Sequence, residues 1–250
     1  MKNYILECCV DSVESAINAK SGGASRIELC SNLIIGGTSP DLALVREIRR
    51  HTNIRIHALI RPRFGDFFYS KYEMEIMKDQ IRSLKEAGVE GVVIGVLDEE
   101  GNLNKDAMKE LIAEADGLSI TLHRAFDMCR DPYQALEDAI ELGIHTILTS
   151  GQKQSAWEGR DLLADLIEKA NGRIDIMAGA GINASAIERL APITKGTSYH
   201  MSGKITLDSQ MKYRKEDVSM GLPSLSEYEI WQTSEDAVRE AVEVLENARN

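Results

Sequence analysis

The stretch SITLHRAFDMCRDPYQALEDAIELGIHTILTS, residues 119–150, decides the fold. It begins with an apolar, β-branched run (119–125), continues through an amphipathic segment (132–142), and enters a second apolar run (146–149) shortly after Gly143. A glycine that ends a helix and leads straight into a strand is typical of the short loops in parallel α/β folds. The stretch therefore predicts one strand–helix–strand unit of a parallel sheet.

The same alternation recurs along the whole chain, which has 250 residues. Eight strand–helix pairs in that length predict a single-domain (β/α)8 barrel (a TIM barrel) spanning residues 1–250, in preference to an open doubly wound sheet. Residues 203–233 are expected to form an insertion between the last strand and the last helix. The strands are expected at 4–10, 26–30, 54–61, 92–97, 119–125, 146–149, 174–178 and 196–200, and the helices at 13–20, 40–50, 73–87, 105–115, 132–142, 159–170, 184–190 and 234–248.

The charge and the cysteine content indicate which kinds of partner the protein binds and in which cellular compartment it resides. The formal net charge is −11, and the basic residues are scattered, so we expect no nucleic-acid partner. The four cysteines show no CxxC or zinc-ribbon spacing, which favours reduced thiols in the cytoplasm. The N-terminus reaches Glu7 before a signal-type apolar region forms, and no apolar run approaches the about 20 residues that span a bilayer. Neither export nor membrane insertion is expected.

Polar residues gather near the carboxyl ends of the expected strands. Residues two apart in a strand share a face, so alternate residues there project into the barrel mouth, where barrel proteins carry their function. Buried charges need partners, and we expect Glu7 or Glu28 to pair with Arg26 or Arg61. An internal ion-pair network that only fills the barrel is the alternative. The residues expected at the mouth are Glu7, Cys9, Asp11, Arg26, Glu28, Cys30, Asn32, His57, Arg61, Arg63, Thr121, His123 and Asp127.

Glycine-rich loops follow the last strands. Backbone N–H groups can approach an anion closely at such loops, and barrels commonly bind phosphate after strands seven and eight. Gly179 and Gly181 follow the seventh strand and Ser202 follows the eighth, while Ser150 and Gly151 follow the sixth. An anion site is therefore one interpretation, and tight turns that merely need glycine are the other.

Cys9 and Cys30 are expected on neighbouring strands at similar height. Two thiolates suit a soft ion such as Cu(I). A buried free cysteine also serves as a small apolar side chain, so both interpretations stay open. His200, at the end of the eighth strand, could act as a base or as a further soft ligand.

Seven short blocks in order along the chain resemble the CutC family, which is named for copper homeostasis. The resemblance implies a cytoplasmic, homo-oligomeric barrel protein that binds copper, with Cys9 and Cys30 at positions associated with Cu(I). The doubled cysteine Cys8-Cys9 departs from the commoner single cysteine, and only Cys9 has the parity to face inward. The blocks are ECCVDS (7–12), RIELC (26–30), GGTSP (36–40), IRPR (60–63), HRAFD (123–127), TSG (149–151) and AGAG (178–181).

Two functional hypotheses follow from these residues. A third possibility is a non-catalytic scaffold that assembles with other copies or partners through residues 203–233. The first is Cu(I) binding by Cys9 and Cys30. The second is a barrel enzyme for a phosphorylated or carboxylated metabolite, since the blocks consist mostly of Arg, Glu, His, Asp and Gly, which are poor Cu(I) ligands. Its acid/base candidates are Glu7, Glu28, His123 and Asp127, and its anion-binding candidates are Arg26, Asn32, Arg61, Arg63, Arg124, Ser150, Gly151, Gly179, Gly181, His200 and Ser202.

Overall fold

Eight parallel strands close into a barrel, which confirms the predicted fold class. The computed structural model describes residues 4–215, 217–218, 220 and 225–247. The ring closes where β1 pairs with β8, with Glu7 opposite His200, while β2 continues the sheet on the other side of β1. The strands are β1 (Ile5–Val10), β2 (Arg26–Leu29), β3 (Arg55–Leu59), β4 (Gly91–Ile94), β5 (Ser119–Leu122), β6 (Thr146–Thr149), β7 (Asp175–Ala178) and β8 (Ser198–Met201).

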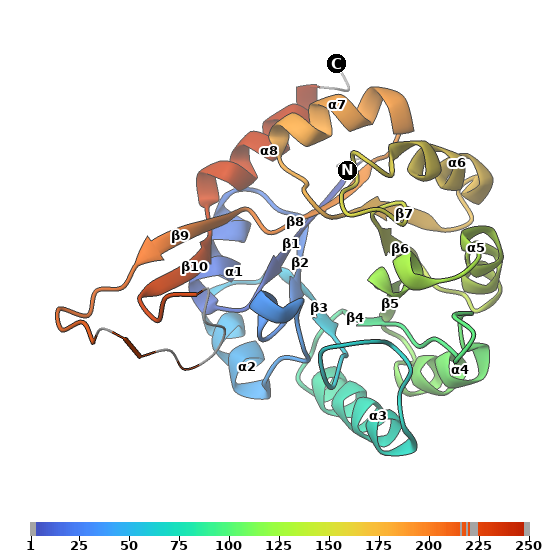
Figure 1. The fold of residues 1–250 in the computed structure, drawn as a ribbon, viewed down its shortest axis with the longest axis horizontal. Helices are drawn as coiled ribbons and strands as arrows, with labels where there is room; N and C mark the ends of the chain where they lie inside the picture. The colour runs from blue at the N-terminus through green and yellow to red at the C-terminus, as the bar shows by residue number, and fades with distance from the viewer. Residues whose placement is uncertain (1–3, 216, 219, 221–224, 248–250) are drawn as a thin grey trace.

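Eight helices form a ring outside the barrel, one after each strand, as Figure 1 shows. Asp131 caps the helix predicted at 132–142 and Asn183 caps the one predicted at 184–190; each accepts a backbone N–H on its side-chain oxygen. The helices are α1 (Val13–Ser21), α2 (Leu42–His51), α3 (Lys71–Glu86), α4 (Lys105–Glu114), α5 (Pro132–Glu141), α6 (Arg160–Ala170), α7 (Ala184–Thr194) and α8 (Glu235–Asn247).

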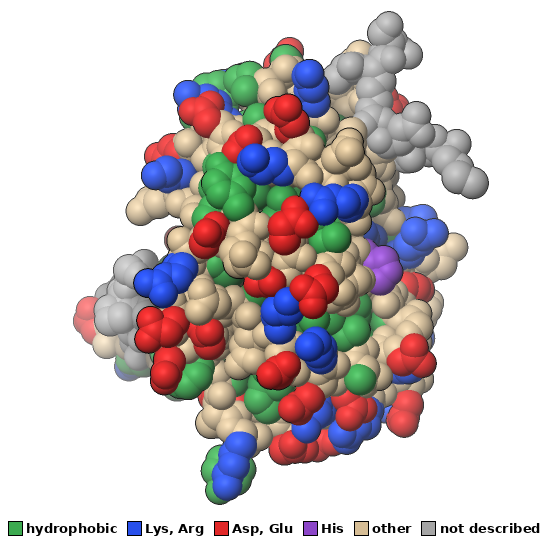
Figure 2. Space-filling model, turned by 90° about the vertical axis from the view of Figure 1, so that its right-hand side faces the viewer, with side chains coloured by type: hydrophobic (Ala, Val, Ile, Leu, Met, Phe, Trp, Pro, Cys, Tyr) green, Lys and Arg blue, Asp and Glu red, His purple; other side chains and the backbone are tan. Residues whose placement is uncertain are grey.

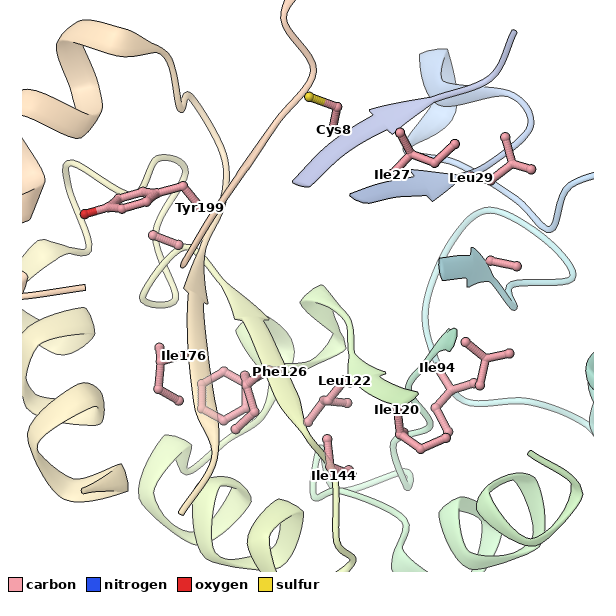
Figure 3. Packing of buried hydrophobic residues seen from close by; sticks show 14 of the residues in the cluster. Cys8, Ile27, Leu29, Ile94, Ile120, Leu122, Phe126, Ile144, Ile176 and Tyr199 are labelled. Carbon is pink, nitrogen blue, oxygen red and sulfur yellow. The ribbon is translucent and has the colours of Figure 1, made fainter. Parts of the chain in front are cut away.

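The main apolar core lies between the strands and the helices, not inside the barrel. Outward-facing residues such as Ile27, Leu122 and Ile176 are almost fully buried there, and Figure 3 shows them among the helices. Cys8 also belongs to this layer, as its strand parity predicted. Fully burying one such aliphatic side chain contributes about 1.5–3 kcal/mol. Because this outer layer supplies most of the apolar burial, the barrel interior can hold polar residues.

The fifth strand is shorter than predicted. It ends at Leu122, and the chain turns into a 3-10 helix, η2 (Arg124–Met128), where a strand was expected to run to residue 125. A second 3-10 helix, η1 (Leu33–Ile35), follows β2. The in–out alternation of side chains does not continue past these strand ends, so positions beyond them cannot be assigned to the mouth by parity.

The insertion after β8 forms an antiparallel hairpin of β9 (Lys204–Asp208) and β10 (Glu229–Thr233), which projects beside the barrel in Figure 1. Its base is fixed to α1, because Thr233 N–H donates to Ser15 Oγ (3.1 Å) and Asn18 donates to the Thr233 carbonyl (2.9 Å). Residues 216, 219 and 221–224 of the expected insertion lie outside the described residues.

Gly91 provides a test of how tightly the barrel interior is packed. A Cβ at this position would lie 2.7 Å from ring atoms of His57, a buried residue on the paired strand. We expect Gly91→Ala to lower the free energy of unfolding by about 1–3 kcal/mol in urea titrations. The control is Ser119→Ala at the paired position on β5; equal stabilities of the two variants would contradict close packing at Gly91.

Candidate functional site

A cavity of about 220 Å³ opens at the carboxyl ends of the strands, and we call it the mouth cavity. Side chains from six strands or their ends contribute to it, together with residues from the loops after β2 and β3 and from η2. Four of the thirteen residues that parity placed at the mouth line it, namely Cys9, Glu28, Arg61 and His123. The lining residues are Cys9, Glu28, Leu33, Gly36, Leu59, Arg61, Phe67, His123, Arg124, Leu148 and His200.

A chain of three charged groups lies below the cavity, inside the barrel. Glu7 forms an ion pair with Arg26, as predicted, and its other oxygen contacts His200 Nδ1 at 2.8 Å. Burial alone would raise the pKa of Glu7, but the charge of Arg26 and the bond to His200 outweigh it and hold that pKa well below its usual value. Glu7 is therefore a buried carboxylate that anchors two cationic partners.

Glu28 lies above this chain and faces its third member, with His200 Nε2 3.7 Å from Glu28 Oε2. Burial raises the pKa of Glu28, and the negative charge of Glu7 adds to that effect. Burial opposes the charged form of His200, yet Cys9, Glu7 and Glu28 outweigh it and raise the pKa of His200 well above its usual value. The pair thus joins a carboxyl group that holds its proton more readily than usual to an imidazole that favours the charged form.

Arg61 carries a charge without a carboxylate partner among the described residues. Its terminal nitrogens donate to the carbonyls of Gly36 (3.1 Å), Gly37 (3.0 Å) and Gly65 (2.9 Å), and it packs 5.2 Å from the centroid of the Phe67 ring. The expected pairing of Arg61 with a glutamate is not among its contacts. Its Nε–H is buried and has no acceptor within the described part of the chain. The hydroxyl of Tyr69, which lies near Arg61, is also buried without a partner among the described residues, so the Nε–H of Arg61 is a cationic donor without a satisfied acceptor.

His123 presents a second unused donor to the same cavity. The backbone N–H of Ala125 donates to His123 Nδ1 (3.1 Å), so the neutral ring must carry its hydrogen on Nε2. Burial, reinforced by the charge of Arg61, lowers the pKa of His123 to about 3, which keeps the ring neutral. Nε2 is buried and has no partner among the described residues. His123 thus offers an N–H, like Arg61.

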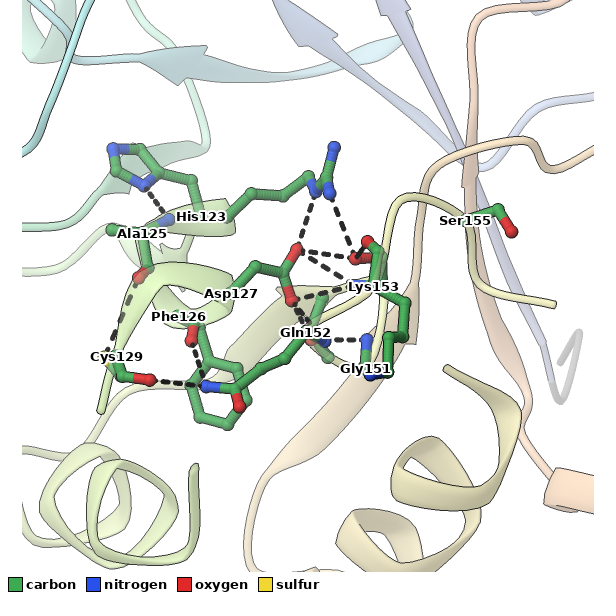
Figure 4. A network of polar contacts seen from close by, with 12 residues as sticks. His123, Ala125, Phe126, Asp127, Cys129, Gly151, Gln152, Lys153 and Ser155 are labelled. Atoms are coloured by element: carbon green, nitrogen blue, oxygen red, sulfur yellow. Dashed lines mark hydrogen bonds and ion pairs between the residues drawn. The ribbon is translucent and has the colours of Figure 1, made fainter. Parts of the chain in front are cut away.

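Asp127 organises a loop instead of facing the cavity. Its carboxylate accepts the backbone N–H groups of Ser150 and Gln152 at 3.1 Å and pairs with Arg124 at 2.7 Å, as Figure 4 shows. Arg124 also donates to Ser150 Oγ (3.0 Å). This network fixes Arg124 at the cavity wall, so Asp127 acts on the cavity only through Arg124.

Cys9 and Cys30 both lie near Glu28. Cys9 is half-buried and lines the mouth cavity, and its thiol donates to the Met201 carbonyl (3.7 Å). Cys30 is fully buried, with its sulfur 3.7 Å from Glu28 Oε2, and burial raises the pKa of its thiol well above the usual value. Within the described residues, no group of three or more His, Cys, Asp or Glu side chains is arranged to hold a metal ion.

Several expected mouth residues lie elsewhere. Asn32, in a left-handed backbone conformation, donates to Thr38 Oγ1, and Arg63 pairs with Asp66 in its own loop and with Glu73 in α3. The residues after β6, β7 and β8 do not line the mouth cavity either: Gly151 donates to the Thr149 hydroxyl, Gly179 to the Thr149 carbonyl, Gly181 lies near Ser155, and Ser202 accepts from Lys204.

The sequence did not point to Phe67, which lines the cavity. Its ring lies 4.8 Å from the His123 ring, and it also packs against Arg61. Phe67 lies in the loop between β3 and α3, where no strand or helix periodicity applies. One aromatic side chain thus packs against both Arg61 and His123, and sequence periodicity could not predict that Phe67 belongs to the site.

The CutC family model matches residues 4–205, more than three quarters of the chain. The chain belongs to the CutC family. The resemblance predicted from the seven sequence blocks is therefore confirmed. The match ends inside β9, so β10 and α8 lie outside it.

Relatives match over nearly the full length. The chain is 45% identical to a CutC family protein of Vibrio campbellii, covering 97% of this chain and 99% of that one. It is also 45% identical to the human copper homeostasis protein cutC homolog, covering 94% and 87%. The crystal structure of the putative copper homeostasis protein CutC of Streptococcus agalactiae superposes with a TM-score of 0.76 at 28% identity, covering 80% of this chain and 98% of that one.

Glu7 provides the sharpest test of the buried charge chain. Glu7→Gln leaves Arg26 as an uncompensated buried charge, so we expect a loss of about 3–5 kcal/mol in the free energy of unfolding. Because the pKa of Glu7 is lowered in the folded state, this contribution is present above its unfolded value near 4.5 and is lost as the pH falls. Urea titrations from pH 7 to pH 3 measure it.

Glu137→Gln is the matched control, because Glu137 pairs with Arg173 on the surface. We expect little change in that variant at any pH. A Glu7→Gln variant as stable as this control at neutral pH would show that the charge chain contributes nothing to folding.

Proposed function

We propose that the mouth cavity binds a small anionic molecule, phosphorylated or carboxylated, and catalyses a reaction on it by acid/base chemistry. The observation that carries the proposal is that Arg61 and His123 both keep a buried N–H without an acceptor among the described residues. Leaving such a group unsatisfied costs about 1–3 kcal/mol. An oxyanion lying between the two donors would satisfy both, and the charge of Arg61 would favour it.

Glu28 and His200 are the candidate proton carriers of this reaction. They line the same cavity, and burial raises the pKa of Glu28, which suits a carboxyl group that takes up and releases a proton. Glu7 and Arg26 hold His200 from below, and Arg124 adds a second cation at the wall. In this proposal Asp127 positions Arg124 and is not itself an acid or a base.

Inorganic phosphate is the simplest probe of the anion site. We expect it to bind the wild-type protein in isothermal titration calorimetry, and His123→Phe to weaken binding about tenfold or more, because a hydrogen bond to a charged group contributes about 1.5–3 kcal/mol. We expect the same direction for Arg61→Gln.

Arg63→Gln serves as the control, since Arg63 is not among the residues that line the cavity and bonds to its own loop and to Glu73 of α3. Equal phosphate affinity in wild type, His123→Phe and Arg61→Gln would overturn the proposal. Thermal unfolding of each variant establishes that it is folded.

Binding of Cu(I) by Cys9 and Cys30 is the second candidate. It is supported by the family's association with copper homeostasis and by the approach of both thiols to Glu28, on adjacent strands. Two thiolates are a sufficient ligand set for Cu(I), which would here be cargo and not a resident cofactor. Binding of Cu(I) would require Cys30 to lose its proton. This step is unfavourable because burial, together with the nearby Glu28, raises the pKa of the thiol.

Copper uptake by the reduced protein tests this candidate. We expect about one Cu(I) per chain in competition with a chelator, and no uptake by the Cys9→Ser/Cys30→Ser double variant. Cys129→Ser is the control, because Cys129 is buried below η2 and bonds to Ala125. Unchanged uptake in the double variant would exclude these two ligands.

We further infer a cytoplasmic homo-oligomer. Four free cysteines support a reducing compartment, and within the described residues no helix is long and apolar enough to cross a membrane. One face of the β9–β10 hairpin exposes Ile205, Leu207 and Ile230, which a second copy would cover. The face of the molecule seen in Figure 2 instead mixes charges of both signs.

A further inference from the structure

A second cavity, of about 190 Å³, adjoins the mouth cavity, and we call it the hairpin cavity. Cys9 and Leu33 line both, so the two cavities meet across these side chains. The far wall of the hairpin cavity comes from the β9–β10 hairpin, through Lys204 and Trp231. The unpaired donors of the mouth and an aromatic side chain of the insertion therefore belong to neighbouring cavities.

The hairpin cavity offers a ligand mainly apolar surface, and three of its polar side chains already have partners. Ser15 Oγ accepts from Thr233 N, Asp11 accepts from Leu33 N, and Ser202 Oγ accepts from Lys204 N. Leu33 and the ring of Trp231 supply apolar wall, and Lys204 and Gln232 add polar side chains.

Trp231 is held in place rather than free to turn. The ammonium of Lys204 lies 3.3 Å from the centroid of its ring, and both residues lie on the same face of the hairpin. The base of the hairpin is bonded to α1 through Thr233. The aromatic wall is thus pre-formed, which lowers the entropy cost of binding against it.

We propose that the ligand of the mouth has two parts: an anionic group held by Arg61 and His123, and an apolar, aromatic-sized group that occupies the hairpin cavity against Trp231. This inference rests on the proposed anion site and adds the class of substrate. Each cavity alone is smaller than the about 300 Å³ at which ligand sites begin, whereas the two together exceed it. Trp231 is then the residue that selects the apolar part.

The junction of the two parts would lie at Cys9, which borders both cavities and lines the mouth cavity together with His200. The bond that joins the acidic group to the apolar group would therefore lie beside the proton carriers. This placement favours an ester of the acid over a free acid with a distant tail. Because the family match ends at residue 205, the selecting side chain belongs to the part of the chain beyond it.

Three matched probes test the proposal by calorimetry on the full chain: 1-naphthyl phosphate, inorganic phosphate and 1-naphthol. We expect 1-naphthyl phosphate to bind about tenfold or more tightly than inorganic phosphate, because the ring loses contact with water. Trp231→Ala should remove this advantage and leave the phosphate affinity unchanged. Ile205→Ala, on the opposite face of the same hairpin, should keep it.

A second readout does not depend on the folding of a cavity variant. In Trp157→Phe protein, Trp231 is the only remaining tryptophan, since the chain has two. We expect its fluorescence to be quenched by 1-naphthyl phosphate and not by inorganic phosphate.

The outcomes separate this inference from the anion site. Equal affinities of 1-naphthyl phosphate and phosphate, or an advantage that survives in Trp231→Ala, overturn the two-part ligand and leave the anion site standing. If 1-naphthol binds as tightly as 1-naphthyl phosphate, the two-part ligand is also overturned. No binding of either phosphate overturns the anion site, and the two-part ligand with it.

Discussion

The structure depends on one constraint: charges inside a closed barrel must satisfy one another. Removing an ion from water costs several kcal/mol even after relaxation, so a buried carboxylate persists only with well-placed partners. Glu7 meets this requirement by bonding Arg26 with one oxygen and His200 with the other. The apolar layer between strands and helices supplies the stabilisation that makes a polar interior tolerable.

The ion pair in the barrel interior is satisfied, but not every inward-facing group is. Glu7 and Arg26 pair with each other, whereas His57 Nδ1, Thr121 Oγ1 and Asp175 Oδ2 lack partners among the described residues, as do Arg61 Nε and His123 Nε2 at the mouth. The last two differ from the others because both side chains line one cavity. Their shared position favours a binding site at the mouth, and it favours an anion, because both unpaired groups are donors.

Much of the fold and part of the site could be predicted from the sequence, for a definite physical reason. In–out alternation holds only while the backbone is extended, so parity placed Glu7, Cys9 and Glu28 correctly on the inward face of their strands. It failed for Asn32 and Asp127, which follow strand ends where the chain turns. Local polar bonds, such as those of Asp127 to its neighbouring loop, decide the backbone there, and periodicity carries no information about them.

The central claim, that the mouth presents two unused N–H donors to an anion, is tested most directly by nitrogen-15 NMR of the His123 ring. The account predicts a neutral ring with its hydrogen on Nε2 between pH 5 and pH 8, since its pKa is about 3, and a shift of that resonance when phosphate is added. A hydrogen on Nδ1, or an Nε2 resonance unmoved by saturating phosphate, would contradict it.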